Sequence, residues 1–140
     1  MKKLVSTILL TLLTIALAFS TACDKEPLVV KDSEHLIVIS VTEDSIKDSK
    51  TLIDYMHVLK SDNELEFEIA NSMITSINNI DNPKDYSYCW MLYTSDTTLS
   101  NSDWGTIDYK GVIYGSAVVG AELLEIKPNN IYIWYYKKFK

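Results

Sequence analysis

The chain contains no arginine, and its 140 residues include only two cysteines and two histidines. All its positive charge is lysine, so the planar, bidentate recognition of phosphate or carboxylate by guanidinium groups is absent. The few cysteines and histidines form no metal-ligand cluster and show no Ser-His-Asp or Cys-His arrangement in their spacing. We therefore expect neither an enzyme nor a metal site.

Positive charge is also scarce relative to negative charge, because 13 lysines face 19 Asp and Glu residues, a formal net charge of −6. Loss of residues 1–22, predicted below, would remove Lys2 and Lys3. The remaining 11 lysines and 19 acidic residues then give a net charge of −8. Such a chain is poorly suited to neutralise phosphates, so we expect no nucleic-acid partner.

The N-terminus, MKKLVSTILLTLLTIALAFSTAC, has a basic start, an apolar stretch and small residues before Cys23. This is the layout of a secretory signal rather than of a membrane-spanning helix. Its end resembles a bacterial lipobox, whose cysteine receives a diacylglycerol group. We expect a signal peptide at 1–22, lipidation of Cys23, and a protein anchored on the extracytoplasmic face of the cell membrane. The alternative is ordinary cleavage and release of a soluble protein.

The rest of the chain has room for one domain at 36–140, preceded by a charged tether at 23–35. Helical spacing of apolar residues predicts one helix over 49–60, with Asp48 or Ser49 as N-cap. Residues 95–110 are polar and predicted to be rich in loops. Short β-rich runs predict strands at 36–41, 64–70, 72–77, 86–93 and 131–136, with two short extended pieces within 111–126. The sum is an α+β domain with a mostly antiparallel sheet.

The stretch YSYCWMLY, residues 86–93, carries apolar or aromatic residues on both sides of a strand, which indicates a central strand. We expect Tyr88 and Trp90 to pack on the helix. Cys89 is expected to be an inert thiol on the opposite face, because an isolated cysteine in a strand usually packs. Tyr93, at the end of the strand, is expected to reach the rim where the loops gather.

Exposed aromatic side chains are the strongest candidates for ligand contact. Trp104 is flanked by Asp103 and Gly105 in a polar segment, so few apolar neighbours are available to bury it. Tyr109 and Tyr114 lie in the same loop and in the glycine-containing segment that follows. Together with Tyr93, these residues are the predicted ligand-binding set.

Three pieces of the sequence occur in an order typical of a known family: TLIDYMHVL, then MITSINNI with YSYCWMLYTSD, then VVGAELLEIKPNNIYIWYY. Their markers are the run Ile74 to Ile77, the Tyr/Trp strand after it, a glycine before a short strand, and the terminal Trp134 and Tyr136. Over most of 36–140 the chain resembles the C-terminal β-domain of transcobalamin and intrinsic factor, and the bacterial lipoproteins that carry that domain (the DUF4430 group).

The resemblance implies a β-grasp-like fold, in which the sheet curls over the single helix. It also implies a binding module for a corrinoid such as cobalamin, completed by a partner, because the family's carriers hold the corrinoid between this domain and a large helical one. The alternative is a cell-envelope adhesion or interaction domain that recognises a protein or a glycan. No other cofactor is expected.

Overall fold

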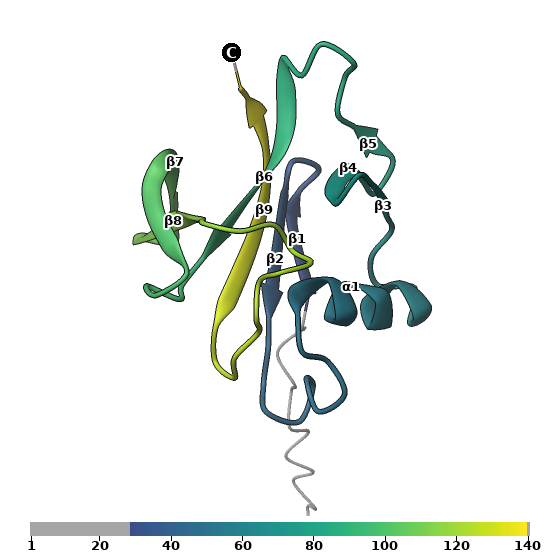
Figure 1. Cartoon of the computed structure of the whole chain (residues 1–140), viewed down its shortest axis with the longest axis vertical. Coiled ribbons are helices and arrows are strands. Elements are labelled where there is room, and N and C mark those ends of the chain that lie inside the picture. The colour runs from purple at the N-terminus through teal and green to yellow at the C-terminus, as the bar shows by residue number, and fades with distance from the viewer. Residues whose placement is uncertain (1–28, 140) are drawn as a thin grey trace, which may run out of the picture.

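A computed structural model describes residues 29–139 of the chain (Figure 1). The predicted signal peptide and Cys23 lie outside these residues. The described part contains one helix and nine strands, and every strand ladder is antiparallel. The expected α+β class with a mostly antiparallel sheet is therefore confirmed.

The strands form two sheets. The large sheet has the order β1-β2-β9-β6-β8-β7, and the small sheet has the order β3-β4-β5. The strands of the large sheet are β1 (Val29–Ser33), β2 (Leu36–Ser40), β6 (Tyr88–Thr94), β7 (Ser100–Tyr109), β8 (Val112–Ala117) and β9 (Ile131–Lys138). Those of the small sheet are β3 (Phe67–Ala70), β4 (Met73–Ile77) and β5 (Ile80–Asp81).

Strand structure is present from Val29, the first described residue, although the sequence predicts that the folded part starts near Leu36. Residues 29–33, which the sequence assigned to the tether, form β1 and pair with β2. Charged and polar residues hid this strand, because the run VVKDS has only two apolar members. β1 forms because its backbone pairs with that of the hydrophobic strand β2, although its own sequence shows no strand pattern.

The single helix, α1, spans Leu52–Ser61, close to the prediction. Its N-cap is Thr51 rather than Asp48 or Ser49. The Thr51 hydroxyl accepts from the Asp54 N–H, and the Asp54 carboxylate accepts from the Thr51 N–H at 3.0 Å, which together form a capping box. The carboxylate also accepts from the Lys50 N–H at 3.1 Å, and the hydrogen bonds from the Thr51 and Lys50 backbones lower the pKa of Asp54.

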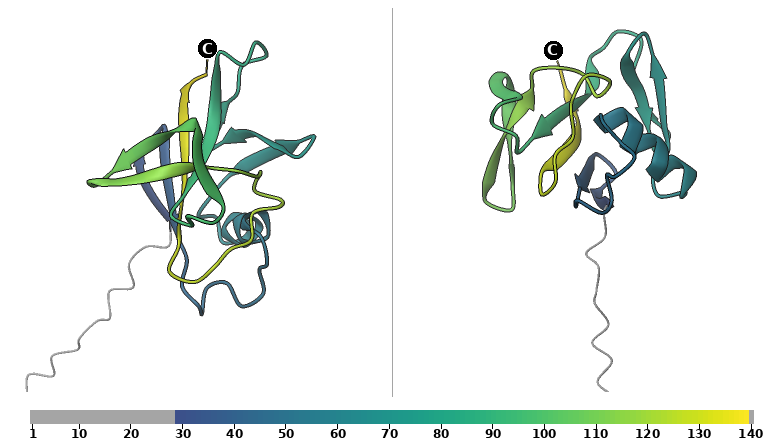
Figure 2. Two further views of the ribbon diagram at one scale, coloured as in Figure 1. Left: turned by 60° about the vertical axis from the view of Figure 1, so that its left-hand side comes forward. Right: turned by 60° about the horizontal axis from the view of Figure 1, so that its bottom comes forward.

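The main core lies between α1, the small sheet and one face of the large sheet. The helix and the small sheet lie on the same side of the large sheet, opposite the β7–β8 hairpin (Figures 1 and 2). Alternate residues of the central strands point into this core. Its members include Ile37 and Ile39 of β2, Leu52, Tyr55, Met56 and Leu59 of α1, Phe67, Ile74 and Ile77 of the small sheet, Trp90 and Leu92 of β6, and Tyr132 and Trp134 of β9.

The opposite face of the large sheet carries a second, smaller core. The β7–β8 hairpin lies over this face (Figure 2). Its tyrosines, Tyr109 and Tyr114, pack against the central strands. The buried members of this core are Val38, Tyr93, Tyr109, Tyr114 and Ile133. Both faces of β6 and β9 are thus covered, which explains why neither side of the aromatic strand is polar.

In the run ELEFEIA (64–70), glutamates alternate with apolar residues, which predicts a half-exposed strand, and the structure confirms this alternation. Leu65 and Phe67 are buried, whereas Glu64, Glu66 and Glu68 are exposed. The ladder itself is shorter than predicted, since β3 begins only at Phe67 and pairs with β4. The acidic residues therefore lie on the solvated side of β3 and of the segment that leads into it.

The predicted loop at 95–110 is largely wrong, because residues 100–109 form β7. This strand pairs with β8 through a two-residue turn at Lys110 and Gly111, both of which have positive φ. A bulge between Asn101 and Thr106 interrupts the ladder, and Gly105 adopts φ +93° there. Polar residues and the bulge disguised the strand, which is held by its partner rather than by its own apolar pattern.

A partly buried ion pair, with Asp96 covered and Lys127 about half exposed, joins the turn after β6 to the turn before β9. Asp96 is only 7% exposed; its carboxylate accepts from Lys127 Nζ at 2.6 Å and from the hydroxyl and N–H of Thr98 at 2.6 and 2.9 Å. The hydrogen bond from Lys127, followed by those from Thr98, lowers the pKa of Asp96 from 3.8 to about 2.

We expect acid to weaken the fold through Asp96. Because the folded-state pKa lies below the unfolded value, the ionised carboxylate stabilises the fold above about pH 4, and this stabilisation is lost as the pH falls towards about 2. Urea unfolding over this interval should show a steeper loss of stability in the wild type than in Asp96→Asn. Equal losses in the two proteins would contradict the assignment.

Candidate functional site: the β6 cleft

An open cleft of about 700 Å³ lies where the two sheets approach each other beside β6. We call it the β6 cleft. Residues of the small sheet, of β6 and of the segment that follows β8 line it, together with Trp104 and Phe139. The lining residues are Ile69, Ser72, Met73, Ile74, Asn82, Tyr86, Cys89, Trp90, Met91, Leu92, Trp104, Ala117, Val118, Val119, Gly120, Ala121, Trp134 and Phe139.

The edge of β6, rather than one of its faces, borders the cleft. Four consecutive residues, 89–92, line it, although neighbours in a strand point to opposite faces. The ladder between β6 and β8 includes only Tyr93 and Thr94, whereas the ladder between β6 and β9 runs from Tyr88 to Thr94. From Leu92 back towards Tyr88, β8 no longer pairs with β6, and this divergence opens the cleft.

Asn82 connects the two sheets across the cleft. Its Oδ1 accepts from the Trp90 N–H at 3.0 Å, and its Nδ2 donates to the Ile74 carbonyl at 2.9 Å. The Trp90 indole N–H also donates to the Ile80 carbonyl at 2.8 Å. These bonds fix β4 and β5 beside β6 and set the width of the cleft.

The rim of the cleft exposes a large apolar surface. Trp104 is 57% exposed and stacks on Phe139, with ring centroids 6.0 Å apart and planes at 24°. Other large side chains on the rim are about half exposed: Met73, Tyr86 and Val118. Exposed aromatic and apolar groups around a concavity are typical of a binding site.

The lining contains no Asp, Glu, Lys or His side chain. Its polar groups are the side chains of Asn82 and Ser72, the tyrosine hydroxyl, the cysteine thiol and indole N–H groups. One of these, the Nε1–H of Trp134, is buried and lacks a hydrogen-bond acceptor among residues 29–139. The cleft is therefore suited to an uncharged, largely apolar ligand that carries hydrogen-bond acceptors.

Of the predicted ligand-binding residues, only Trp104 lines the cleft, and its predicted exposure is confirmed. Tyr93, Tyr109 and Tyr114 are buried in the second core, at 0%, 8% and 6% exposure. The expectation that Tyr93 reaches the rim is wrong, because the β7–β8 hairpin covers it. Lys137 Nζ donates to its hydroxyl at 3.2 Å. Burial raises the pKa of Tyr114.

The remaining residues of the aromatic strand divide between core and surface. Trp90 is buried in the main core with the helix residues, as predicted. Tyr88 is 43% exposed and stacks on Tyr136 at 5.6 Å instead of packing on the helix. Cys89 is buried, and its thiol donates to the Tyr86 carbonyl at 3.7 Å.

Several cleft residues were missed by sequence reasoning: Met73, Tyr86, Val118 and Phe139. Each comes from a different segment, and each looks like an ordinary core residue in its local pattern. The signal that distinguishes them is exposure, which depends on the divergence of β8 from β6. Only the run of aromatic residues in β6 marked the region in advance.

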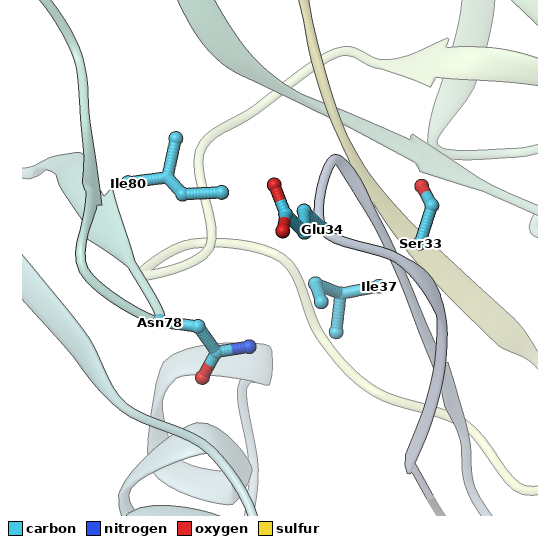
Figure 3. A pocket seen from close by; sticks show the side chains of 5 residues that line it. All are labelled: Ser33, Glu34, Ile37, Asn78 and Ile80. Atoms are coloured by element: carbon cyan, nitrogen blue, oxygen red, sulfur yellow. The ribbon is translucent and has the colours of Figure 1, made fainter.

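A second pocket, of about 510 Å³, lies between the β1–β2 turn and the small sheet. Figure 3 shows Asn78 and Ile80, from the β4–β5 turn and β5, on one side of it, and Ser33, Glu34 and Ile37, from the β1–β2 hairpin, on the other. Its lining is small and mixed, with no aromatic residue. It therefore offers less apolar contact than the β6 cleft.

Two further observations concern the part of the chain that the structure describes. Between residues 29 and 139, no three His, Cys, Asp or Glu side chains gather in a way that could hold a metal ion. The one described helix is too short to cross a membrane.

Comparisons with protein-family models, with curated proteins and with solved structures found no match to this chain. The likeness to the transcobalamin C-terminal domain therefore stays a prediction from the sequence.

Proposed function

We propose that this protein is a lipid-anchored extracytoplasmic binding module whose ligand site is the β6 cleft. The single observation that carries the proposal is the cleft itself: uncharged, about 700 Å³ in volume and rimmed by an exposed Trp104 and Phe139. Exposing such groups costs hydration free energy unless a ligand covers them. The anchoring part of the proposal rests on the signal and Cys23 of the sequence.

We further propose that the fold is β-grasp-like, in the sense that a curved sheet packs over one helix. Support comes from the main core, in which α1 contributes four buried residues against β2, β6 and β9.

The ligand class that the sequence resemblance suggests is a corrinoid, bound together with a partner that covers the open side. A flat macrocycle whose ring face can stack on aromatic side chains and whose edges carry amide groups suits an uncharged cleft with a Trp104–Phe139 stack on its rim. Titration with cobinamide or cobalamin, up to about 1 mM, should quench tryptophan emission, because three tryptophans line the cleft. Trp104→Ala should reduce the quenching. An unchanged emission and a flat calorimetric trace would rule out corrinoids and leave the module to another ligand.

We predict that Cys23 carries the anchor. In a bacterial host, Cys23→Ser should leave the precursor unprocessed or release the protein, and labelling with a radioactive fatty acid should disappear. A diacylglycerol group with an added N-acyl chain is sufficient for stable anchoring, because binding by one chain alone is marginal. Ser20→Ala, which preserves the cysteine, is the matched control. Labelling that persists in Cys23→Ser would contradict the assignment.

A second candidate function is recognition of a protein or glycan partner in the cell envelope. The observation that favours a protein is the exposed aromatic and apolar rim of the cleft, because large exposed apolar patches typically mark protein interaction sites.

A further inference from the structure

We propose that the free end of the β7–β8 hairpin inserts into the surface of the phospholipid bilayer to which the protein is anchored, through the side chains of Val112 and Ile113. We call residues 110–113 the hairpin tip. This inference rests on the anchoring part of the proposed function, and it adds which end of the domain contacts the membrane.

The hairpin tip exposes two adjacent branched apolar side chains. Val112 is 52% exposed and Ile113 is 63% exposed. Neighbours in a strand point to opposite faces, so both faces of the hairpin are uncovered at this end. Tyr114, the next residue, is buried in the second core. The hairpin tip therefore projects beyond the strands on which the hairpin packs, and adjacent exposed apolar groups are typical of a protein or membrane contact.

The strand register shows where the hairpin tip lies relative to the start of β1. Successive pairs align five residues in a row across the large sheet: Val29, Ile39, Tyr132, Thr94 and Gly115. Because these ladders are all antiparallel, β1 and β8 run in the same direction. β8 begins at Val112 and reaches the row at Gly115, so the hairpin tip lies beyond the row, on the side from which the chain enters β1. The free end of the hairpin and the start of β1 both lie at the lower edge of the domain in the right-hand view of Figure 2.

The length of chain between the predicted lipid and the domain favours a bilayer as the surface that the hairpin tip meets. Five residues separate Cys23 from Val29. At full extension this segment spans about 20 Å, which is an upper limit set by backbone geometry. A lipid on Cys23 therefore keeps the start of β1 close to the bilayer. The hairpin tip is at the same end of the sheet, so the bilayer is the nearest apolar phase that can cover it.

The charge of the hairpin turn is balanced, which favours insertion driven by apolar contact. Asp108 and Lys110 are both exposed, and the Asp108 carboxylate accepts from the Gly111 N–H at 2.9 Å. Lys110 Nζ lies 5.1 Å from the centroid of the Tyr109 ring. The predicted mature chain carries a net charge of −8, which an anionic surface repels. The hairpin tip offers contact without added negative charge, and the long stem of Lys110 lets its ammonium stay at the level of the lipid headgroups.

The same register places the β6 cleft at the other end of the large sheet. Tyr88 pairs with Lys138, and Phe139 follows directly after β9 and lines the cleft. With the hairpin tip on the bilayer, the cleft lies at the end of the domain away from the membrane. A ligand in the extracytoplasmic space can therefore reach it.

The test uses the full-length protein, purified from bacterial membranes and reconstituted in phosphatidylcholine vesicles that contain a doxyl-labelled lipid as quencher. A nitrobenzoxadiazole fluorophore is attached to Ile113→Cys and, separately, to the matched control Val118→Cys. Val118 is 46% exposed and directly follows β8, on the other side of the aligned row. Apart from Cys23, the native chain contains only the buried Cys89, and wild type treated in parallel measures any labelling there.

The doxyl lipid should quench the label of Ile113→Cys at least about twofold and that of Val118→Cys only slightly, because only the first lies within the interface. Val112→Asp, added to Ile113→Cys, should restore the emission to the level of the control, because a carboxylate resists transfer out of water. Circular dichroism checks that all variants are folded.

The outcomes separate the inference from the proposed function, because fatty-acid labelling of the same preparations reports the anchor independently of quenching. Anchored protein without quenching at Ile113→Cys overturns the inference and leaves the anchor, and the hairpin tip would then suit a protein partner. Equal quenching at Ile113→Cys and Val118→Cys also overturns it, because the cleft end would then lie equally close to the lipid. Absence of the fatty acid removes the anchor and the inference with it. Titration with cobinamide reports the cleft separately.

Discussion

Trp90→Ala should lower the free energy of unfolding by about 3 to 5 kcal/mol, the range for truncating a buried tryptophan. Trp90 is 5% exposed, packs in the main core and lies 5.3 Å from the Tyr136 ring. Its indole N–H also holds the Ile80 carbonyl, and its backbone N–H is bound by Asn82. The substitution therefore leaves a cavity and loosens the small sheet from the large one. Urea unfolding followed by circular dichroism measures the change.

Trp90→Phe is the matched control, because it keeps an aromatic ring and removes the indole N–H. It should cost about 1 to 3 kcal/mol, mainly from the Ile80 carbonyl left without its donor. A loss below about 1 kcal/mol for Trp90→Ala would mean that the small sheet is held by other contacts. The cleft would then have a different structural basis.

Trp104→Ala, unlike Trp90→Ala, should affect ligand binding much more than stability. Because the indole is 57% exposed, its removal should change stability by less than about 1 kcal/mol. It should weaken binding in the cleft by about 2 kcal/mol, or about thirtyfold, as expected for an aromatic anchor. Unfolding and titration of the same protein with cobinamide measure both quantities.

Val112→Ala is the control for this prediction, since Val112 is similarly exposed on the same hairpin but does not line the cleft. It should alter neither stability nor binding appreciably. A stability loss of about 3 kcal/mol or more in Trp104→Ala would show that the contact between Trp104 and Phe139 stabilises the fold as a buried core contact does. Trp104 would then no longer be a site residue.

The elements predicted well are those with strong periodic patterns. Leu52, Met56 and Leu59 repeat at helical spacing, and the helix covers them. The alternation of glutamate and apolar residues around Phe67 predicted a half-exposed strand, and each residue lies on the predicted face. These patterns report which side of an element is buried, and burial is the largest local term in the free energy of folding.

The elements missed are those whose stability comes from a neighbour. β1 and β7 contain many polar residues and form because β2 and β8 offer backbone groups to pair with. For the same reason, the sequence did not predict the burial of Tyr109 and Tyr114, because their local pattern does not show that the hairpin folds back over β9. A local pattern contains no information on such pairing, because the partner is distant in sequence.

The sequence by itself determined the class of the domain, its central aromatic strand, the exposure of Trp104, and the absence of arginine, which removes guanidinium recognition. Each of these follows from residue type and local periodicity. The tertiary structure alone decided where a ligand site lies. The cleft exists because β8 leaves β6 at Tyr93 and because Asn82 holds β4 at a distance from that edge. Both are relations between segments far apart in the chain, so they appear only when the chain is folded.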